Sequence, residues 1–422
     1  MRATVYPTAL KRGMWAGSDW QARVLAGAYR RRIEKGSNMA VTTYMAWPEY
    51  PRMSYQVSRI IALSDFGAAD FTEVYQAVLR IDPTDDYSWN GEWLRMGRLA
   101  EEMAVEAEAH ANHSSARFAH QRASNYYRLA QDSLPADDPD KLPQLWKARE
   151  HFIASLPYQE TRVDRVDVQY ENTTLDGFFV HARWSDGPAP TIIWIGGADS
   201  LTEENYFNMG IQAANNGYNA LFYDHPGPGL AVYQHGFGTR FDTEHFISPA
   251  VDYLLTRPEV DGDRIIMGGP SFAAYHVPRA AAYEPRLAAA VSAGAMYQWG
   301  GGPMESPSHL SRMHKLFGVD NDDDYREVCK KFTLEGVLGK ITCPFLVIVG
   351  VDDFVPLPAT TSIRYLEELG SEVKKAIVIE HDNELGGVLH CQKDNLHVIQ
   401  AEVFNWLNDV LDYRPIGPAG AS

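Results

Sequence analysis

The chain has 422 residues, enough for two domains, and its 45% hydrophobic and 22% charged residues are typical of a globular protein. A net charge of −17 argues against a nucleic-acid partner, which would need a basic face. No apolar run approaches the roughly 18 residues that span a bilayer, and the N-terminus lacks the apolar core of a signal peptide. The 3 cysteines form no Cys-x-x-Cys pair, as is usual in a reducing compartment. We therefore predict a cytoplasmic protein without nucleic-acid or membrane partners.

The first part of the chain reads as a basic arm followed by a helical region. Residues 1–43 are weakly patterned, and we expect this arm to be loosely ordered. Residues 44–160 carry apolar side chains at three- and four-residue spacing and almost no alternating β-branched residues, which predicts an all-helical region. The predicted helices cover residues 71–80, 99–111, 114–134 and 141–156.

The pattern changes after residue 160. Residues 163–170 and 175–183 alternate between apolar and polar side chains, as expected of a β-hairpin. Short apolar runs then alternate with helical patterns, which predicts a mostly parallel, doubly wound α/β sheet in residues 161–413, followed by a tail at 414–422. The predicted strands of this sheet are 191–195, 219–223, 264–267, 288–292, 345–349 and 376–379. Ligands of such sheets bind at the carboxyl ends of the strands.

The most informative motif follows the strand predicted at 264–267. Gly269-Pro270-Ser271-Phe272-Ala273 matches the Gly-x-Ser-x-Gly/Ala pattern of a nucleophile elbow, in which a serine stands at a tight strand-to-helix turn. Small residues such as Gly269 and Ala273 are needed there because the strand and the helix approach closely. The alternative is that Ser271 only caps a helix.

A second loop lies at the end of the strand predicted at 191–195. Gly196-Gly197-Ala198 could turn backbone N–H groups toward a ligand, with Ala198 and Phe272 as the two donors of an oxyanion hole. The alternative is a simple glycine turn.

Candidates for an acid and a base follow the last two predicted strands. Asp352 and Asp353 compete for the acid position, and the Gly-x-x-Asp spacing from Gly350 favours Asp353, although either residue could cap a helix. His390, on a loop after the last strand, is favoured over His381 as the base. The order Ser271, Asp353, His390 is that of the α/β hydrolases.

Two further histidine observations limit the chemistry. His225 follows the strand at 219–223, but it precedes the serine, so we interpret it as structural or substrate-lining. The histidines show no metal-ligand spacing, and we predict no metal site.

Aromatic residues of the helical region could supply one or two side chains to the pocket: Tyr87, Trp89, Trp93, Tyr126 and Tyr127.

These motifs, together with residues 122–130, Gly196–Ser200 and Asp224–Gly229, resemble the FrsA-like group of α/β hydrolases over about residues 87–411. The group includes a nicotine-pathway hydrolase and fungal hydrolases that shorten polyketide chains. The resemblance places the catalytic triad at Ser271, Asp353 and His390. It implies a helical cap over the active site, no cofactor and a homodimer. His225 and Pro228 depart from the group's usual pattern.

The resemblance also implies the reaction. Members cleave a C–C bond next to a carbonyl in a 1,3-dicarbonyl substrate, or an ester. The segment 297–308 is expected to line the pocket, with Tyr297 as a lining residue and Glu305 as a carboxylate that could assist C–C cleavage. We predict a serine hydrolase acting on a small carbonyl compound. The alternatives are an acyltransferase or cyclase that uses the same triad, and a non-catalytic binding protein on this fold.

Overall fold

The computed structural model describes residues 44–300, 307–353, 365–381 and 384–417. The arm predicted at 1–43 and the candidate Glu305 lie outside these residues. No helix in the described ranges is long and apolar enough to cross a membrane.

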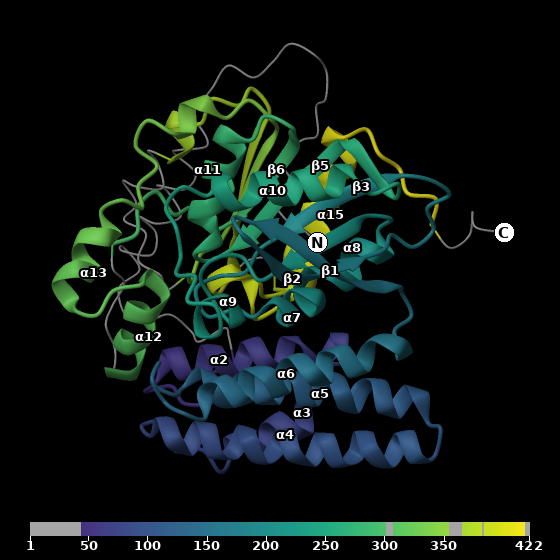
Figure 1. The fold of residues 1–422 in the computed structure, drawn as a ribbon, viewed down its shortest axis with the longest axis vertical. Helices are drawn as coiled ribbons and strands as arrows, with labels where there is room; N and C mark the ends of the chain where they lie inside the picture. The colour runs from purple at the N-terminus through teal and green to yellow at the C-terminus, as the bar shows by residue number, and fades with distance from the viewer. Residues whose placement is uncertain (1–43, 301–306, 354–364, 382–383, 418–422) are drawn as a thin grey trace.

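In the part of the chain that the structure describes, five α-helices precede the sheet and are called the cap below. They are α2 (Pro51–Ala62), α3 (Phe71–Val78), α4 (Asp86–Ala109), α5 (His113–Asp132) and α6 (Lys141–Ser155). Four of them correspond to predicted helices, whereas α2 has no counterpart among these. Figure 1 shows α2 and α6 next to the sheet and α4 on the far side of the cap.

Aromatic side chains hold the cap together. Trp89 and Trp93 of α4 pack against each other with ring centroids 5.6 Å apart, and Trp93 lies 5.4 Å from Tyr126 of α5. All three side chains are buried, so they form the apolar interior that the amphipathic helices require.

An eight-stranded sheet follows, in the order β1-β2-β4-β3-β5-β6-β7-β8. The pairs β1–β2 and β2–β4 are antiparallel, and the other pairs are parallel. This confirms the predicted α/β-hydrolase class of fold. The strands are β1 (Val163–Tyr170), β2 (Thr173–Val180), β3 (Ala189–Trp194), β4 (Asn219–Tyr223), β5 (Val260–Pro270), β6 (Leu287–Ala293), β7 (Phe345–Gly350) and β8 (Lys374–Ile379).

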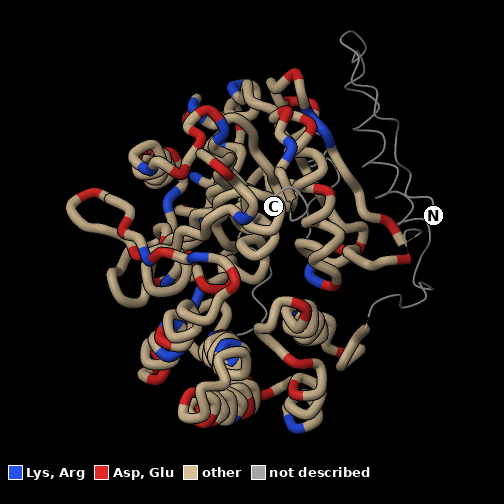
Figure 2. The backbone as a smooth tube through the Cα atoms, turned by 90° about the vertical axis from the view of Figure 1, so that its right-hand side faces the viewer, with Lys and Arg blue, Asp and Glu red and all other residues tan. Residues whose placement is uncertain are grey.

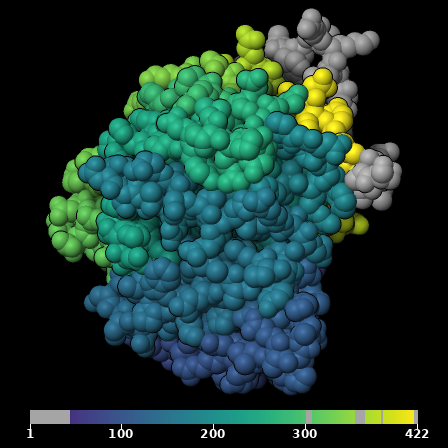
Figure 3. Space-filling model, turned by 45° about the vertical axis from the view of Figure 1, so that its right-hand side comes forward, coloured from purple at the N-terminus to yellow at the C-terminus, as the bar shows by residue number. Residues whose placement is uncertain are grey.

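Helices cover the sheet on both faces, which is why the central strands β3 and β4 are buried along their whole length. The helices of this part are α7 (Thr202–Asn205), α8 (Ile211–Asn215), α9 (Leu230–Tyr233), α10 (Glu244–Leu255), α11 (Ala273–Tyr283), α12 (Pro307–Phe317), α13 (Asp322–Cys329) and α15 (Leu396–Val410). In the view of Figure 3 the cap lies directly against the sheet part. In Figure 2 acidic and basic residues are interspersed over both parts.

Candidate active site

Ser271 stands at a strained turn between β5 and α11. Its φ of 58° lies in the left-handed region, which is unusual for a residue with a side chain. A Cβ atom on Gly269 would lie 2.5 Å from the Cβ of Ala273 and 2.7 Å from the carbonyl oxygen of Ile195. Glycine is therefore required two residues before the serine, as expected of a nucleophile elbow.

Ser271, His390 and Asp353 form one hydrogen-bonded chain. The Nε2 atom of His390 lies 2.9 Å from Ser271 Oγ, and its Nδ1 atom lies 2.8 Å from Asp353 Oδ1. The three residues follow β5, β8 and β7, so the carboxyl edge of the sheet brings together residues that are up to 119 positions apart. This is the arrangement in which an imidazole can take a proton from a serine while a carboxylate orients the ring.

The competing acid and histidine form a separate pair. Asp352 Oδ2 lies 2.9 Å from His381 Nε2. Among the described residues, neither of the two forms a hydrogen bond or ion pair with Ser271. The structure thus places Asp353 and His390, rather than Asp352 and His381, beside the serine.

The surroundings of His390 favour its protonated form. Burial of the ring would lower the pKa of His390, but the Asp353 carboxylate and the Cys391 side chain outweigh this effect and raise the pKa well above its ordinary value. The positive charge that the ring would gain on accepting the serine proton is therefore stabilised where it forms.

Two backbone N–H groups beside the serine have no partner in the described chain. The N–H groups of Ala198 and Phe272 donate no hydrogen bond to another protein atom among these residues. The loop of Ala198 lies close to the serine, since a Cβ atom on Gly197 would be 2.8 Å from Ser271 Cβ. Unpaired N–H donors beside a serine side chain are what an oxyanion hole would require.

A pocket of about 420 Å³ is lined by Ser271, His390 and Ala198 and extends under the cap. Helix α2 contributes four lining residues, among them Tyr55 and Arg59, and Lys141 begins α6. The Tyr55 ring lies 5.9 Å from the His390 ring, between centroids. Sequence reasoning missed these cap residues; the five aromatic residues that it suggested for the pocket are not among the residues that line it.

Buried ion pairs join the cap to the sheet part. Arg59 of α2 donates to Asp199 Oδ2 at 2.7 Å and to Glu204 Oε1 at 2.8 Å. Burial alone would raise the pKa of Glu204, but Arg128 and Arg59 outweigh it and lower the pKa to about 2. Glu204 is therefore charged at neutral pH.

A second buried arginine makes a similar connection. Arg149 of α6 donates to Glu203 and, at 2.8 and 2.9 Å, to both oxygens of Asp224. Asp224 also accepts a hydrogen bond of 2.5 Å from Thr202 Oγ1. The segments that follow β3 and β4 are thus both tied to cap helices.

The suggested lining residues have other places in the structure. His225 is buried between the rings of Phe246 and His276 and does not line the pocket, a position that fits the structural interpretation of this residue. The Tyr297 hydroxyl donates to Glu368 at 2.9 Å. Tyr297 does not line the pocket either; its neighbours Met296 and Gln298 do. The remaining suggestion, Glu305, lies outside the described residues.

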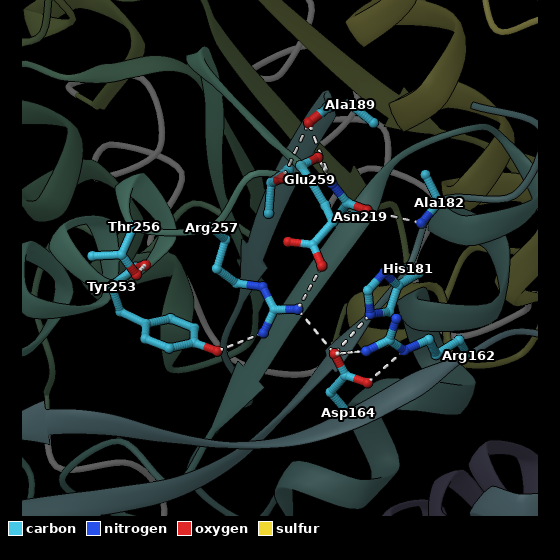
Figure 4. Close-up of polar contacts among 11 residues, drawn as sticks. Arg162, Asp164, His181, Ala182, Ala189, Asn219, Tyr253, Thr256, Arg257 and Glu259 are labelled. Carbon is cyan, nitrogen blue, oxygen red and sulfur yellow. Dashed lines mark hydrogen bonds and ion pairs between the residues drawn. The ribbon is translucent and has the colours of Figure 1, made fainter. Parts of the chain in front are cut away.

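One cluster in the described chain has the composition of a metal site. Ligand atoms of Asp164, His181 and Glu259 lie within 4.8 Å of one another. Figure 4 shows the Arg257 guanidinium among them, donating to Asp164 at 2.9 Å and to Glu259 at 3.1 Å. Glu259 precedes β5, so the cluster lies at the opposite end of that strand from Ser271. Arg257 and Arg162, which donates to Asp164 at 2.8 Å, together balance the charge of the two carboxylates, and we interpret the cluster as a structural ion network.

A mostly parallel sheet with a serine at a sharp strand-to-helix turn defines an α/β hydrolase, and the protein is an enzyme of this class. A family model described as "Esterase FrsA-like" matches residues 50–300. The chain therefore belongs to the FrsA-like esterase family, as the sequence motifs predicted.

Curated relatives carry hydrolase names. The alpha/beta hydrolase psoB of Aspergillus fumigatus is 32% identical over 275 residues, which cover 61% of this chain and 62% of psoB. The hydrolyase poxO of Penicillium oxalicum is 26% identical over 411 residues, covering 85% of this chain and 97% of poxO. The match thus spans less than two thirds of psoB but nearly all of poxO.

Solved structures share the fold over most of the chain. A 2,6-dihydroxy-pseudo-oxynicotine hydrolase superposes with a TM-score of 0.71 at 23% identity, covering 86% of this chain and 97% of that one. AbyA5 gives a TM-score of 0.66 at 18% identity, covering 88% and 97%. At these identities the likeness shows the fold alone.

Proposed function

We propose that the protein is a serine hydrolase that cleaves a small carbonyl compound through an acyl-enzyme. The observation that carries this proposal is the continuous chain from Asp353 through His390 to Ser271, with hydrogen bonds of 2.8 and 2.9 Å, at the wall of a pocket. Unpaired N–H groups of Ala198 and Phe272 beside the serine support it further.

In the first step His390 Nε2 accepts the Ser271 hydroxyl proton while Oγ forms a bond to the substrate carbonyl carbon. The carbonyl electron pair moves to oxygen, and the N–H groups of Ala198 and Phe272 stabilise the oxyanion. One such donor typically contributes about 2.7–4 kcal/mol to the transition state. Asp353 keeps the imidazole in the required orientation.

Collapse of this intermediate breaks the bond to the leaving group. For an ester the C–O bond breaks and an alkoxide leaves; for a 1,3-dicarbonyl compound the C–C bond breaks and the electron pair leaves as an enolate. In both cases His390 returns the proton to the leaving group. Water then attacks the acyl-enzyme with His390 as base, which releases a carboxylic acid and restores Ser271.

Labelling with a fluorophosphonate probe tests the nucleophile directly. We expect the probe on the peptide that contains Ser271, with the labelling rate strongly reduced in His390→Ala and retained in the matched control His381→Ala. Labelling at another residue, or equal labelling in both histidine variants, would contradict the proposal.

A substrate series then identifies the bond that is cut. Aryl esters, alkyl esters and linear 1,3-diketones are incubated with the enzyme in water enriched in oxygen-18. Hydrolysis places the heavy oxygen in the carboxylic acid product, whereas transfer of the acyl group to an alcohol or cyclisation onto the substrate's own nucleophile does not. Products without the label would exclude hydrolysis.

A further inference from the structure

The pocket wall is more basic than acidic. Among the described residues, Lys and Arg side chains outnumber the two aspartates that line the pocket, Asp132 and Asp199. The basic lining residues are Arg52, Arg59, Lys141, Arg312 and Lys393. The chain as a whole has a net charge of −17, so the basic lining of the pocket differs in sign from the average of the protein.

Part of this charge is already neutralised. Arg59 is paired with Asp199 and Glu204, as described above, and Lys393 Nζ lies 3.9 Å from Glu204 Oε1. These two cations therefore belong to the network that joins cap and sheet and do not need a ligand.

Lys141 has no such partner. Its side chain is 2% exposed, and its Nζ donates only to the backbone oxygens of Gln131 at 2.6 Å and Leu134 at 3.2 Å. An ammonium group has three N–H donors, so one remains without an acceptor in the described chain. The Tyr233 ring lies 5.2 Å from Nζ. None of these contacts supplies a negative charge.

Arg312 stands beside Lys141 in a similar situation. It reaches from α12 to the backbone oxygens of Ser133 at 3.2 Å and Leu134 at 3.5 Å, and among the described residues no carboxylate lies within ion-pair distance of it. The carbonyl groups at the C-terminal end of α5 offset part of both positive charges. Among the described residues, these two neighbouring cations have no carboxylate within ion-pair distance, although Asp132 and Asp138 act on Lys141 at longer range.

We propose that Lys141 and Arg312 bind a carboxylate of the substrate, so that the enzyme acts on carbonyl compounds that carry a carboxylate group. A carboxylate accepts several hydrogen bonds, including two from one guanidinium, and would supply the missing negative charge to both residues. Because burying an unpaired ammonium is costly, a bound anion would be favoured there over a neutral group. Lys141, Arg312 and Ser271 all line this pocket, so one bound molecule could contact the pair and the serine.

The assignment of a substrate rests on the proposed hydrolase function, whereas carboxylate binding does not. Two measurements therefore test it. The first compares kcat/KM for 4-nitrophenyl hemiesters of adipic, pimelic and suberic acid with kcat/KM for the 4-nitrophenyl esters of the monocarboxylic acids of equal carbon number. The second measures binding of the same dicarboxylates, and of the diols of equal length, to Ser271→Ala by calorimetry.

We expect the carboxylate compound to be preferred by about tenfold or more at one chain length. Lys141→Met and Arg312→Gln should each remove most of this preference, mainly by raising KM for the hemiester more than KM for the neutral ester. Lys147→Met is the matched control, because Lys147 lies on the same helix, binds Glu101 at 2.7 Å and does not line the pocket. Because Arg312 lies on a different helix from Lys141, Arg312→Gln still tests the proposal if Lys141→Met does not fold.

The proposal is supported if a carboxylate preference in either measurement is lost in these variants. It is overturned if neither measurement shows a preference, or if the preference survives in both variants. Dicarboxylate binding that depends on Lys141, without serine labelling or ester cleavage, would reject the hydrolase function and keep the carboxylate site. Serine labelling and ester cleavage without any carboxylate preference would keep the hydrolase function and reject the carboxylate site.

Discussion

Arg59 on α2 donates to Asp199 at 2.7 Å, and Asp199 directly follows Ala198 on the loop after β3. The cap therefore fixes the position of the loop that carries one proposed oxyanion donor. The same guanidinium holds Glu204, whose side chain is fully buried, with 0% exposure.

Replacing this arginine tests both roles. Arg59→Gln should lower the free energy of unfolding by about 3–5 kcal/mol, because it leaves the buried Glu204 carboxylate with less compensation. It should also lower kcat by about 100-fold, because the Ala198 loop loses its anchor. Urea unfolding and ester kinetics measure the two effects. Arg326→Gln, at an exposed arginine of α13, is the control and should change the unfolding free energy by no more than about 0.5 kcal/mol.

The two neighbouring aspartates should differ sharply. Asp353→Asn should lower kcat by about 10⁴, since the amide cannot hold His390 in the tautomer that accepts the serine proton. Asp352→Asn removes only the partner of His381 and should retain activity within about tenfold. Steady-state kinetics on one neutral ester compare them, and equal losses would contradict the assignment of Asp353.

The pH dependence should reflect His390. Because the pKa of His390 is raised above its ordinary value, mainly by Asp353 against the effect of burial, the ring is protonated at low pH and cannot act as a base. We expect kcat/KM for a neutral ester to rise with pH through an apparent pKa above about 6.5 and then level off. In Asp353→Asn the remaining activity should show a lower apparent pKa. A profile that is flat from pH 5 to 9 would contradict this role.

Carboxylate recognition should have the opposite pH dependence. Burial and the nearby Arg312 lower the pKa of Lys141 to about 7, while Asp132 and Asp138 oppose the shift. Below this pKa the ammonium is charged and binds an anion; above it the charge is lost. The ratio of kcat/KM for hemiesters to that for neutral esters should therefore fall between about pH 6 and 8 in the wild type, and stay constant in Lys141→Met.

Gly197 tests the closeness of the oxyanion loop to the serine. In Gly197→Ala the new methyl group would meet Ser271 Cβ at 2.8 Å and Oγ at 3.1 Å. We expect fluorophosphonate labelling to slow by about 100-fold. Gly187→Ala is the control, since nothing lies within 4 Å of the Cβ position there. Equal labelling rates would show that the loop can move away from the serine.

Much of the sheet could be predicted because its central strands are continuous apolar runs. The prediction was too short for β5, which spans Val260–Pro270 rather than 264–267. Gly268, Gly269 and Pro270 have no strand preference of their own, but they pair with Val291, Ser292 and Ala293 of β6. The neighbouring strand, rather than local propensity, imposes the extended conformation there.

Helix α2 illustrates what sequence reasoning could not find. It carries an apolar stripe that includes Met53, Val57 and Ile60, but its buried residues also include the polar Ser54, Gln56, Ser58 and Arg59, whose burial the spacing of apolar residues does not predict. The partners that make this face stable, such as Asp199 and Glu204, lie about 140 residues further along the chain. The pocket residues of α2 were missed for the same reason.

The proximity of Ser271, Asp353 and His390 could be predicted because each residue follows a strand at the carboxyl edge of the sheet. The direction of the Tyr297 side chain could not be predicted, because neighbouring residues in an extended segment point to opposite sides and the sequence does not show which side faces the pocket. Met296 and Gln298 face the pocket, and the residue between them points toward Glu368. A pattern of residue types without a regular element does not define that alternation.

The arginines of the cap also bear on whether the sheet part could fold as a separate fragment. A fragment that began at residue 161 would keep Glu203, Glu204 and Asp224 but lose Arg59 and Arg149, which pair with them. The sheet part would then keep Lys393 beside Glu204 but would lack the two arginines that offset this group of carboxylates near the loops that surround Ser271. The helices before the sheet thus supply, through Arg59 and Arg149, positive charges that the buried carboxylates of the sheet part require. Exchange of this cap for that of a relative would preserve folding only if both arginines came with it.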